Sequence, residues 1–159
     1  MAKMTSITQI GMTTANLEKK IENFAKVGVG PFEIVVDTLN GLGAPATNTK
    51  YFGVPTNNDV RVAICVLDGL EIELIQPMDE NGTYAEHLRT HGEGYIHHLA
   101  IVTDDNAGFR KIMKNEGIRS EWKGDVDPEL GQSFEYFDTR DLLGFCIELH
   151  DPEPVPDED

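Results

Sequence analysis

Apolar and polar residues alternate along several short stretches of the chain, which is the pattern of half-buried β-strands. In the first half this pattern predicts strands at Ser6–Thr13, Phe32–Asp37, Val60–Leu67 and Leu70–Ile75. After the first strand, Asn16 can cap a helix, and apolar residues then recur at helical spacing as far as Ala25. Asp68-Gly69 is typical of a two-residue hairpin turn between the last two strands. Residues 38–58 are rich in Asn, Gly, Thr and Pro and predict a long connection, with a short strand near Lys50–Val54.

The second half follows the same order of elements. Helices are expected at Thr83–His91 and Asn106–Asn115, and strands at Tyr95–Thr103, Ile118–Trp122, Ser133–Phe137 and Phe145–Leu149. The residues repeat as well, because Ile72–Pro77 matches Ile147–Pro152 at four of six positions. Internal repeats set the whole architecture, so we expect an α+β fold of two tandem βαβββ modules. A single domain over residues 1–150 would hold module one at about 5–78 and module two at about 93–150. The acidic, Pro-rich tail 151–159 is expected to be disordered.

The charge balance narrows the range of partners. The chain has 159 residues, with 13 Lys and Arg against 28 Asp and Glu, which gives a net charge of −15. This charge repels phosphate backbones and anionic lipids, so neither nucleic acid nor a membrane surface is an expected partner. The N-terminus lacks the pattern of a secretory signal, and Cys65 and Cys146 lie singly inside apolar strands. We therefore expect a cytoplasmic protein with reduced, buried thiols.

Four polar residues stand at equivalent places in the two predicted modules. Gln9 and His98 lie in the first strand of each module, and Glu73 and Glu148 lie in the last. A carboxylate on a core face is costly unless it is paired or binds a metal. Two carboxylates, one imidazole and one amide suit a divalent cation with positions left open for substrate, so these four residues are candidate metal ligands.

Each candidate also has a structural interpretation. Gln9 can be a buried amide bonded to the backbone, and Glu73 can point to water together with Glu71. His97 faces away from His98, so one of the two histidines is expected to be a ligand and the other a packing residue.

Other residues also have both a functional and a structural interpretation. His87 and His91 have a spacing that could bind metal on a helix, but surface exposure is expected. Tyr136 and Phe145 can line a pocket or only pack, and Glu33 is the weaker candidate for a base.

Four segments together resemble the vicinal oxygen chelate superfamily. They are QIGMTTANLEKKI, EIELIQP, GEGYIHHLAIVTDD and GFCIELHD, and the resemblance covers roughly residues 6–150. This superfamily includes glyoxalase I, methylmalonyl-CoA epimerase, extradiol dioxygenases and bleomycin-resistance proteins. The resemblance implies a cupped mixed sheet around one divalent metal ion, which Gln9, Glu73, His98 and Glu148 would hold. Zn, Co, Ni, Mn and Fe all tolerate such ligands.

The resemblance is strongest to methylmalonyl-CoA epimerase and implies an enzyme that moves a proton next to a metal-bound carbonyl. Glu148 would be the general base, and a homodimer acting on a small molecule is expected. The ligand order resembles that of some glyoxalase I enzymes, so a lyase of that type is an alternative, as is a non-catalytic binding protein. A ring-cleaving dioxygenase needs two histidines and one carboxylate and is less favoured.

The chain departs from the epimerases at a second glutamate that serves the other face of the substrate. The matching position is expected at Asn57, which cannot take a proton. Asn57 is therefore predicted to contact the substrate, together with Tyr136 and Phe145.

Overall fold

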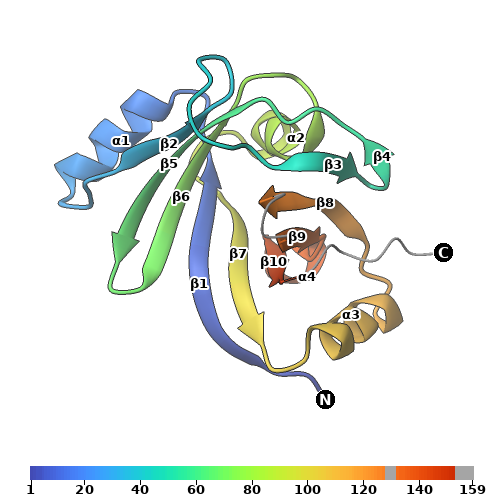
Figure 1. The fold of residues 1–159 in the computed structure, drawn as a ribbon. Coiled ribbons are helices and arrows are strands. Elements are labelled where there is room, and N and C mark those ends of the chain that lie inside the picture. Colours follow the sequence, from blue (N-terminus) through green and yellow to red (C-terminus); the bar gives the residue numbers. More distant parts are fainter. Residues whose placement is uncertain (128–131, 153–159) are drawn as a thin grey trace. The chain divides into compact units, whose positions relative to one another are not determined.

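The computed structural model describes residues 1–127 and 132–152, which form an α+β fold (Figure 1). Its contacts divide the chain into two compact units. The first-module unit contains residues 9–45 and 57–97, and the second-module unit contains residues 1–8, 46–56 and those from His98 onward. Two of these segments, residues 1–8 and 46–56, precede module two in the sequence but pack within its unit.

The first-module unit is a mixed sheet with strand order β2-β5-β6-β1. Its elements are β1 (Met4–Thr13, from Gln9 onward in this unit), α1 (Leu17–Lys26), β2 (Glu33–Asp37), β5 (Val60–Leu67), β6 (Leu70–Pro77) and α2 (Gly82–His91). Strands β1 and β6 are parallel, and the other pairs are antiparallel. The expected hairpin turn between β5 and β6 is present, with both Asp68 and Gly69 at positive φ.

Helix α1 lies alongside β2 and β5 (Figure 1). As predicted, Asn16 caps it: the Asn16 side chain accepts a hydrogen bond of 3.0 Å from the backbone N–H of Lys19. The helix is attached to the sheet through Leu17, which is fully buried with Ala63 and Leu74. Burial of one leucine of this kind contributes about 1.5–3 kcal/mol, so the apolar face of α1 is what holds it to this side of the sheet.

The second-module unit is also a mixed sheet, with strand order β7-β10-β9-β8-β3-β4. Its elements are β3 (Thr47–Tyr51), β4 (Val54–Pro55), β7 (Ile96–Thr103), α3 (Asn106–Asn115), β8 (Ser120–Asp127), β9 (Gln132–Phe137), α4 (Arg140–Leu143) and β10 (Cys146–Asp151). Strands β7 and β10 are parallel, and the remaining pairs are antiparallel. Helix α3 packs through Met113 against Ile101, Phe137 and Leu149, which places the apolar core of this unit on the α3 side of the sheet.

The internal repeat is therefore visible in the strand order, since β2-β5-β6-β1 corresponds to β8-β9-β10-β7. The connection over residues 38–58 was predicted with one short strand near Lys50–Val54, and the structure has two strands there. It contains the β3–β4 hairpin, and β3 pairs with β8, a strand more than 60 residues further along the chain (Thr47 opposite Asp125). Local patterning cannot predict such a pairing, because the partner strand is remote in sequence.

Three smaller expectations have an outcome. Cys65 and Cys146 are both free and buried, as predicted. None of the helices within residues 1–127 and 132–152 is long and apolar enough to cross a membrane. Asp151, expected in the tail, ends strand β10, whereas residues 153–159 lie outside the described part of the chain.

Candidate functional site

Strand register places the candidate residues of each unit at the same relative positions. In the first-module unit, Gln9 on β1 is level with Glu71 on β6, and Gly11 is level with Glu73. In the second-module unit, His98 on β7 is level with Cys146 on β10, and Ala100 is level with Glu148. Glu73 and Glu148 thus each lie beside a small residue of the neighbouring strand. In each unit, that small residue follows the candidate ligand of the first strand by two positions. The repeat alignment of Glu73 with Glu148 is therefore present in the backbone of each sheet.

His98 and Glu148 contact each other in the second-module unit. The His98 Nε2 atom lies 3.2 Å from the Glu148 Oε2 atom, and the two side chains are 0% and 5% exposed. The Tyr136 ring stacks on the His98 ring with centroids 4.6 Å apart, and Tyr136 is level with Glu148 in the β9–β10 ladder. The structure thus brings two of the predicted ligands and one predicted substrate residue onto one sheet face, opposite the core packed by α3.

His150 also belongs to this group, although it was not among the predicted site residues. Its Nε2 atom lies 3.1 Å from the other Glu148 oxygen, Oε1, and its side chain is 48% exposed. The available signal was the two-residue spacing from Glu148 along β10, which puts both side chains on one face. Glu148 therefore lies between two imidazoles, one buried and one open to solvent.

Burial and charge set the protonation of this group. Burial lowers the pKa of His98 below its ordinary value, so the ring is neutral at pH 7. Burial alone raises the pKa of Glu148, but the nearby imidazoles of His150 and His98 outweigh it and hold the pKa below its usual range. Glu148 is therefore ionised beside a neutral His98. These are the protonation states in which a carboxylate and an imidazole bind a metal ion.

In the first-module unit, Gln9 donates a hydrogen bond of 2.5 Å from its Nε2 to Glu71 Oε1. Gln9, Glu71 and Glu73 are all partly buried. Glu71 and Glu73 share a face of β6 because they are two residues apart. Glu71 therefore holds the Gln9 amide in place, while Glu73 occupies the position equivalent to Glu148.

A different cluster is the densest group of possible metal ligands. Within residues 1–127 and 132–152, Glu121, Asp138 and Cys146 alone place three donor atoms of this kind within 4.8 Å of one another. Arg140, however, already forms ion pairs with Glu121 and Asp138. Burial lowers the pKa of Arg140, but its hydrogen bond to Glu121 and the charges of the neighbouring acidic groups together outweigh burial and raise the pKa. Burial and the Glu121 carboxylate raise the pKa of the Cys146 thiol, so the sulfur stays protonated. The guanidinium neutralises these carboxylates, and the cluster is better explained as a structural ion pair.

The remaining candidates lie elsewhere. Asn57 is exposed in the connection before β5. Phe145 packs against the hydrophobic cluster under α3, on the side of the sheet away from Glu148. Glu33 is exposed at the start of β2.

The expectation that His87 is exposed is wrong, and the structure gives the reason. The His87 side chain is buried because its ring packs edge-on against His97 and stacks on His91, with centroids 5.0 Å and 4.6 Å apart. His97 is fully buried and shares a hydrogen bond of 2.8 Å with the Thr83 hydroxyl. His97 therefore packs against α2 within the first-module unit.

Comparison with known proteins now identifies the family. Residues 8–136 match the Glyoxalase/Bleomycin resistance protein/Dioxygenase superfamily. The chain belongs to this superfamily. The resemblance read from the sequence is thus confirmed. No curated protein matches the chain.

Solved structures show the same superfamily fold. A methylmalonyl-CoA epimerase in complex with methylmalonyl-CoA and NH4+ is 21% identical with a TM-score of 0.63, over 93% of this chain and 94% of that one. The Mycobacterium tuberculosis methylmalonyl-CoA epimerase is 22% identical with a TM-score of 0.60, over 96% and 90%. A Streptomyces coelicolor epimerase variant bound to 2-nitronate-propionyl-CoA is 22% identical with a TM-score of 0.60, over 93% and 97%. At these identities the similarity establishes the fold of this superfamily member.

Proposed function

We propose that this superfamily member is a metal-dependent isomerase or epimerase that moves a proton next to the carbonyl of a small acyl or keto substrate. The observation that carries the proposal is the buried contact between His98 and Glu148, with Glu148 ionised and His98 neutral. A buried carboxylate without a full positive partner is costly, and a divalent cation would compensate it.

The donor set fits such a cation. We propose His98 and Glu148 as ligands from the second-module unit, with Gln9 and Glu73 as their equivalents in the first-module unit. The matching strand register of the two units supports this assignment. Imidazole, amide and carboxylate donors suit a borderline divalent metal such as Zn, Co, Ni, Mn or Fe. When bound, the cation would polarise a substrate carbonyl and so acidify the adjacent C–H.

Glu148 is the proposed general base. Its lowered pKa keeps it ionised near neutral pH, ready to accept a proton from carbon. His150 contacts the second oxygen of the same carboxylate and is half exposed, so it can pass that proton to and from water. Tyr136 stacks on His98 and fixes the plane of its ring. Together these side chains position one catalytic carboxylate and exchange its proton with water.

An acyl-CoA thioester is the first substrate to test, because two of the similar structures carry such compounds in their names. Asn57, at the position expected to match the second glutamate of the epimerases, is exposed and cannot take a proton, so a single base is proposed. A glyoxalase I-type lyase would use the same carboxylate chemistry on a different substrate. We further propose that the protein acts in the cytoplasm as a homodimer.

Metal analysis provides the first test. The purified protein, dialysed against each divalent metal in turn, should retain about one ion per chain, and Glu148→Gln should retain less. Glu135→Gln is the matched control, because it removes a buried carboxylate from the other face of the same sheet. If the native protein retains no divalent ion, the metal-dependent proposal fails and a binding protein of the same fold is favoured.

Solvent-deuterium exchange tests the reaction itself. The metal-loaded protein is incubated in D₂O with methylmalonyl-CoA, other acyl-CoA thioesters and 2-keto acids, and deuterium at the carbon next to the thioester or keto carbonyl is followed by mass spectrometry. Exchange that depends on both metal and Glu148 is the expected result. An absence of exchange with every acyl-CoA would remove the epimerase reading, and exchange confined to keto compounds would favour the alternative substrates.

A further inference from the structure

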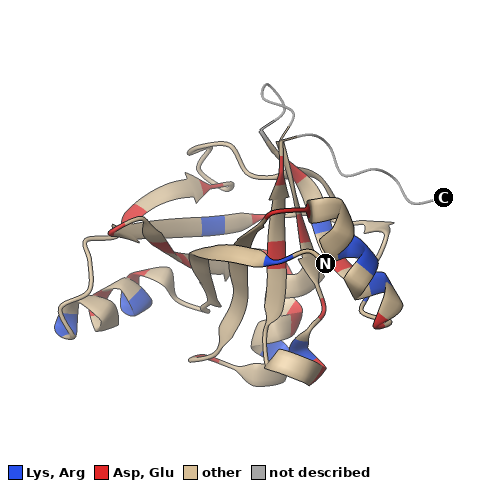
Figure 2. Ribbon diagram, turned by 90° about the horizontal axis from the view of Figure 1, so that it is seen from below, with Lys and Arg blue, Asp and Glu red and all other residues tan. Residues whose placement is uncertain are grey.

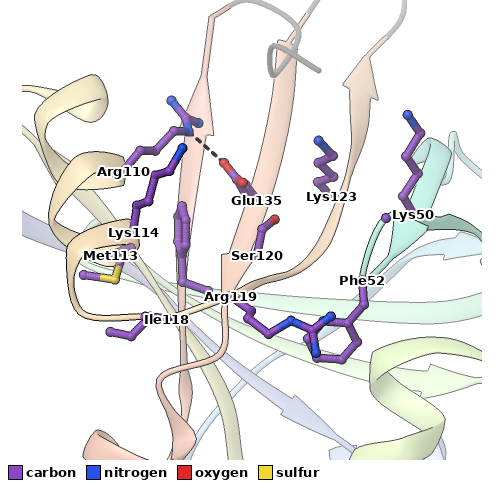
Figure 3. A pocket seen from close by; sticks show the side chains of 13 residues that line it. Lys50, Phe52, Arg110, Met113, Lys114, Ile118, Arg119, Ser120, Lys123 and Glu135 are labelled. Atoms are coloured by element: carbon purple, nitrogen blue, oxygen red, sulfur yellow. Dashed lines mark hydrogen bonds and ion pairs between the residues drawn. The ribbon is translucent and has the colours of Figure 1, made fainter. Parts of the chain in front are cut away.

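The second-module unit also contains a pocket that is lined by basic side chains. A pocket of about 520 Å³ opens between α3, β8, β9 and the β3–β4 turn (Figure 3). This is within the range of small-molecule pockets. Its lining includes Lys50, Arg110, Lys114, Arg119 and Lys123, and Glu135 is the one acidic residue among the described residues that line it. The pocket therefore holds 5 of the 13 Lys and Arg of a chain whose net charge is −15.

Helix α3 carries several basic residues, which Figure 2 shows in blue on the helix beside the N label. Arg110 is neutralised, because it pairs with Glu135 at 2.7 Å and also with Asp151. Lys114 and Lys123 make no ion pair with the described residues of the chain. In Figure 3 the Lys50, Lys114 and Lys123 side chains all extend upward in the view. Like charges gathered in one pocket repel one another, and a bound anion would relieve that repulsion.

Arg119 is held by an aromatic ring instead of a carboxylate. Its guanidinium carbon lies 4.3 Å from the centroid of the Phe52 ring. Phe52 and Gly53 form the two-residue turn between β3 and β4, with φ of 47° and 81°. A bulky aromatic residue rarely adopts positive φ, so the turn keeps Phe52 at a conformational cost. The fold thus fixes Arg119 at the pocket wall, where the described part of the chain gives it no ion pair.

This pocket is separate from the candidate catalytic face. Glu135 lines the pocket, and its neighbour Tyr136 stacks on His98. Successive residues of a strand point to opposite faces, so the pocket opens on the α3 side and Glu148 lies on the other side.

We propose that this pocket binds a small ligand with clustered phosphates, either inorganic diphosphate or the diphosphate of a nucleotide. Arg and Lys side chains converging on one concavity are the usual recognition elements for phosphate groups. Among the described lining residues, basic side chains outnumber the single carboxylate, so the pocket suits a ligand with several negative charges. The acidity of the whole chain opposes a nucleic acid, whose backbone would extend beyond the pocket. This assignment does not depend on the proposed function.

Isothermal titration calorimetry of the full chain in about 0.15 M salt tests the proposal, with pyrophosphate, ADP, ATP and orthophosphate as separate probes. Pyrophosphate or a nucleotide should bind more tightly than orthophosphate, because more phosphate oxygens meet more cations. Lys114→Gln and Lys123→Gln should each weaken binding about tenfold, the usual scale for loss of one charge-assisted contact.

Lys111→Gln is the matched control, since Lys111 is an exposed lysine of the same helix outside the pocket. It removes the same charge and should leave binding unchanged. Binding of pyrophosphate but not nucleotides would identify the free anion as the ligand, and the reverse would identify a nucleotide. The proposal is overturned if none of these phosphates binds, if Lys111→Gln weakens binding as much as Lys114→Gln, or if a single-stranded oligonucleotide binds more tightly than any of them.

Discussion

The carboxylate of Glu148 lies 3.2 Å from Nε2 of His98, across the parallel strands β10 and β7. The two residues are separated by 50 positions in the sequence and are both almost fully buried. This contact is also the reason that several substitutions nearby should have different effects on metal affinity, turnover and stability.

Tyr136 is predicted to act through His98. The Tyr136 ring stacks on the His98 imidazole, so Tyr136→Leu should let the imidazole rotate. Metal affinity should fall by about 10- to 100-fold, as it does at other metal sites when a supporting residue is lost. Tyr136→Phe keeps the stacked ring and should stay close to the parent protein. Competition with a chromophoric chelator measures both affinities. Equal losses in the two variants would mean that the hydroxyl, and not the stacking, matters.

His150 is predicted to affect turnover more than metal binding. In His150→Asn, Glu148 keeps its contact with His98 but loses the half-exposed imidazole at its second oxygen. Deuterium exchange should slow by roughly tenfold, less than the 10²–10⁴ expected on removing a general base, while metal content stays the same. Exchange rates and metal analysis of the same preparation check this. If metal content falls together with the exchange rate, His150 is a metal ligand instead.

Much of this site could be predicted from the sequence because the chain repeats itself. The alignment of Glu73 with Glu148 follows from the matching segments IELIQP and IELHDP, and the strand registers reproduce it. The hydrogen bond from Gln9 to Glu71 could not be predicted, because it depends on the register between two parallel strands that are remote in sequence. His150 was missed since it follows the apolar part of its strand and resembles a surface residue.

The fold shows the same division between local and remote information. Helix α3 was predicted with its observed bounds, Asn106–Asn115, because capping and apolar spacing are local properties. The pairing of β3 with β8 and the burial of His87 depend on remote neighbours. The sequence therefore predicted only a connection with one short strand, and an exposed His87 ring. The cationic pocket has the same origin, since its lysines come from segments far apart in the chain.

The cluster around Arg140 is predicted to stabilise the fold and not to bind metal. Arg140→Met leaves the Glu121 carboxylate buried without its partner and should lower the free energy of unfolding by about 3 kcal/mol. The double variant Arg140→Met/Glu121→Met removes both charges and should recover most of that loss. Urea unfolding of both variants gives the comparison. If the double variant is as unstable as the single one, packing and not charge explains the effect.

Asp37 is predicted to make the free energy of unfolding depend on pH in the acidic range. Hydrogen bonds from Asn40 and from Arg61 hold the pKa of the Asp37 carboxyl below its ordinary value. Because the folded pKa lies below the unfolded one of about 3.9, the ionised group stabilises the folded protein fully above that pH. This contribution is lost as the pH falls through the folded pKa.

Asp37→Asn should therefore be less stable than the parent protein at neutral pH, and the difference should shrink as the pH is lowered below about 4. Asn40→Ala removes the leading hydrogen bond but keeps Arg61, so its stability should fall between the two. Urea unfolding between pH 3 and pH 7 measures all three proteins. A difference between parent and Asp37→Asn that stays constant over this range would show that the interaction is insensitive to the ionisation of Asp37, because protonating the parent carboxyl would then have no effect on stability.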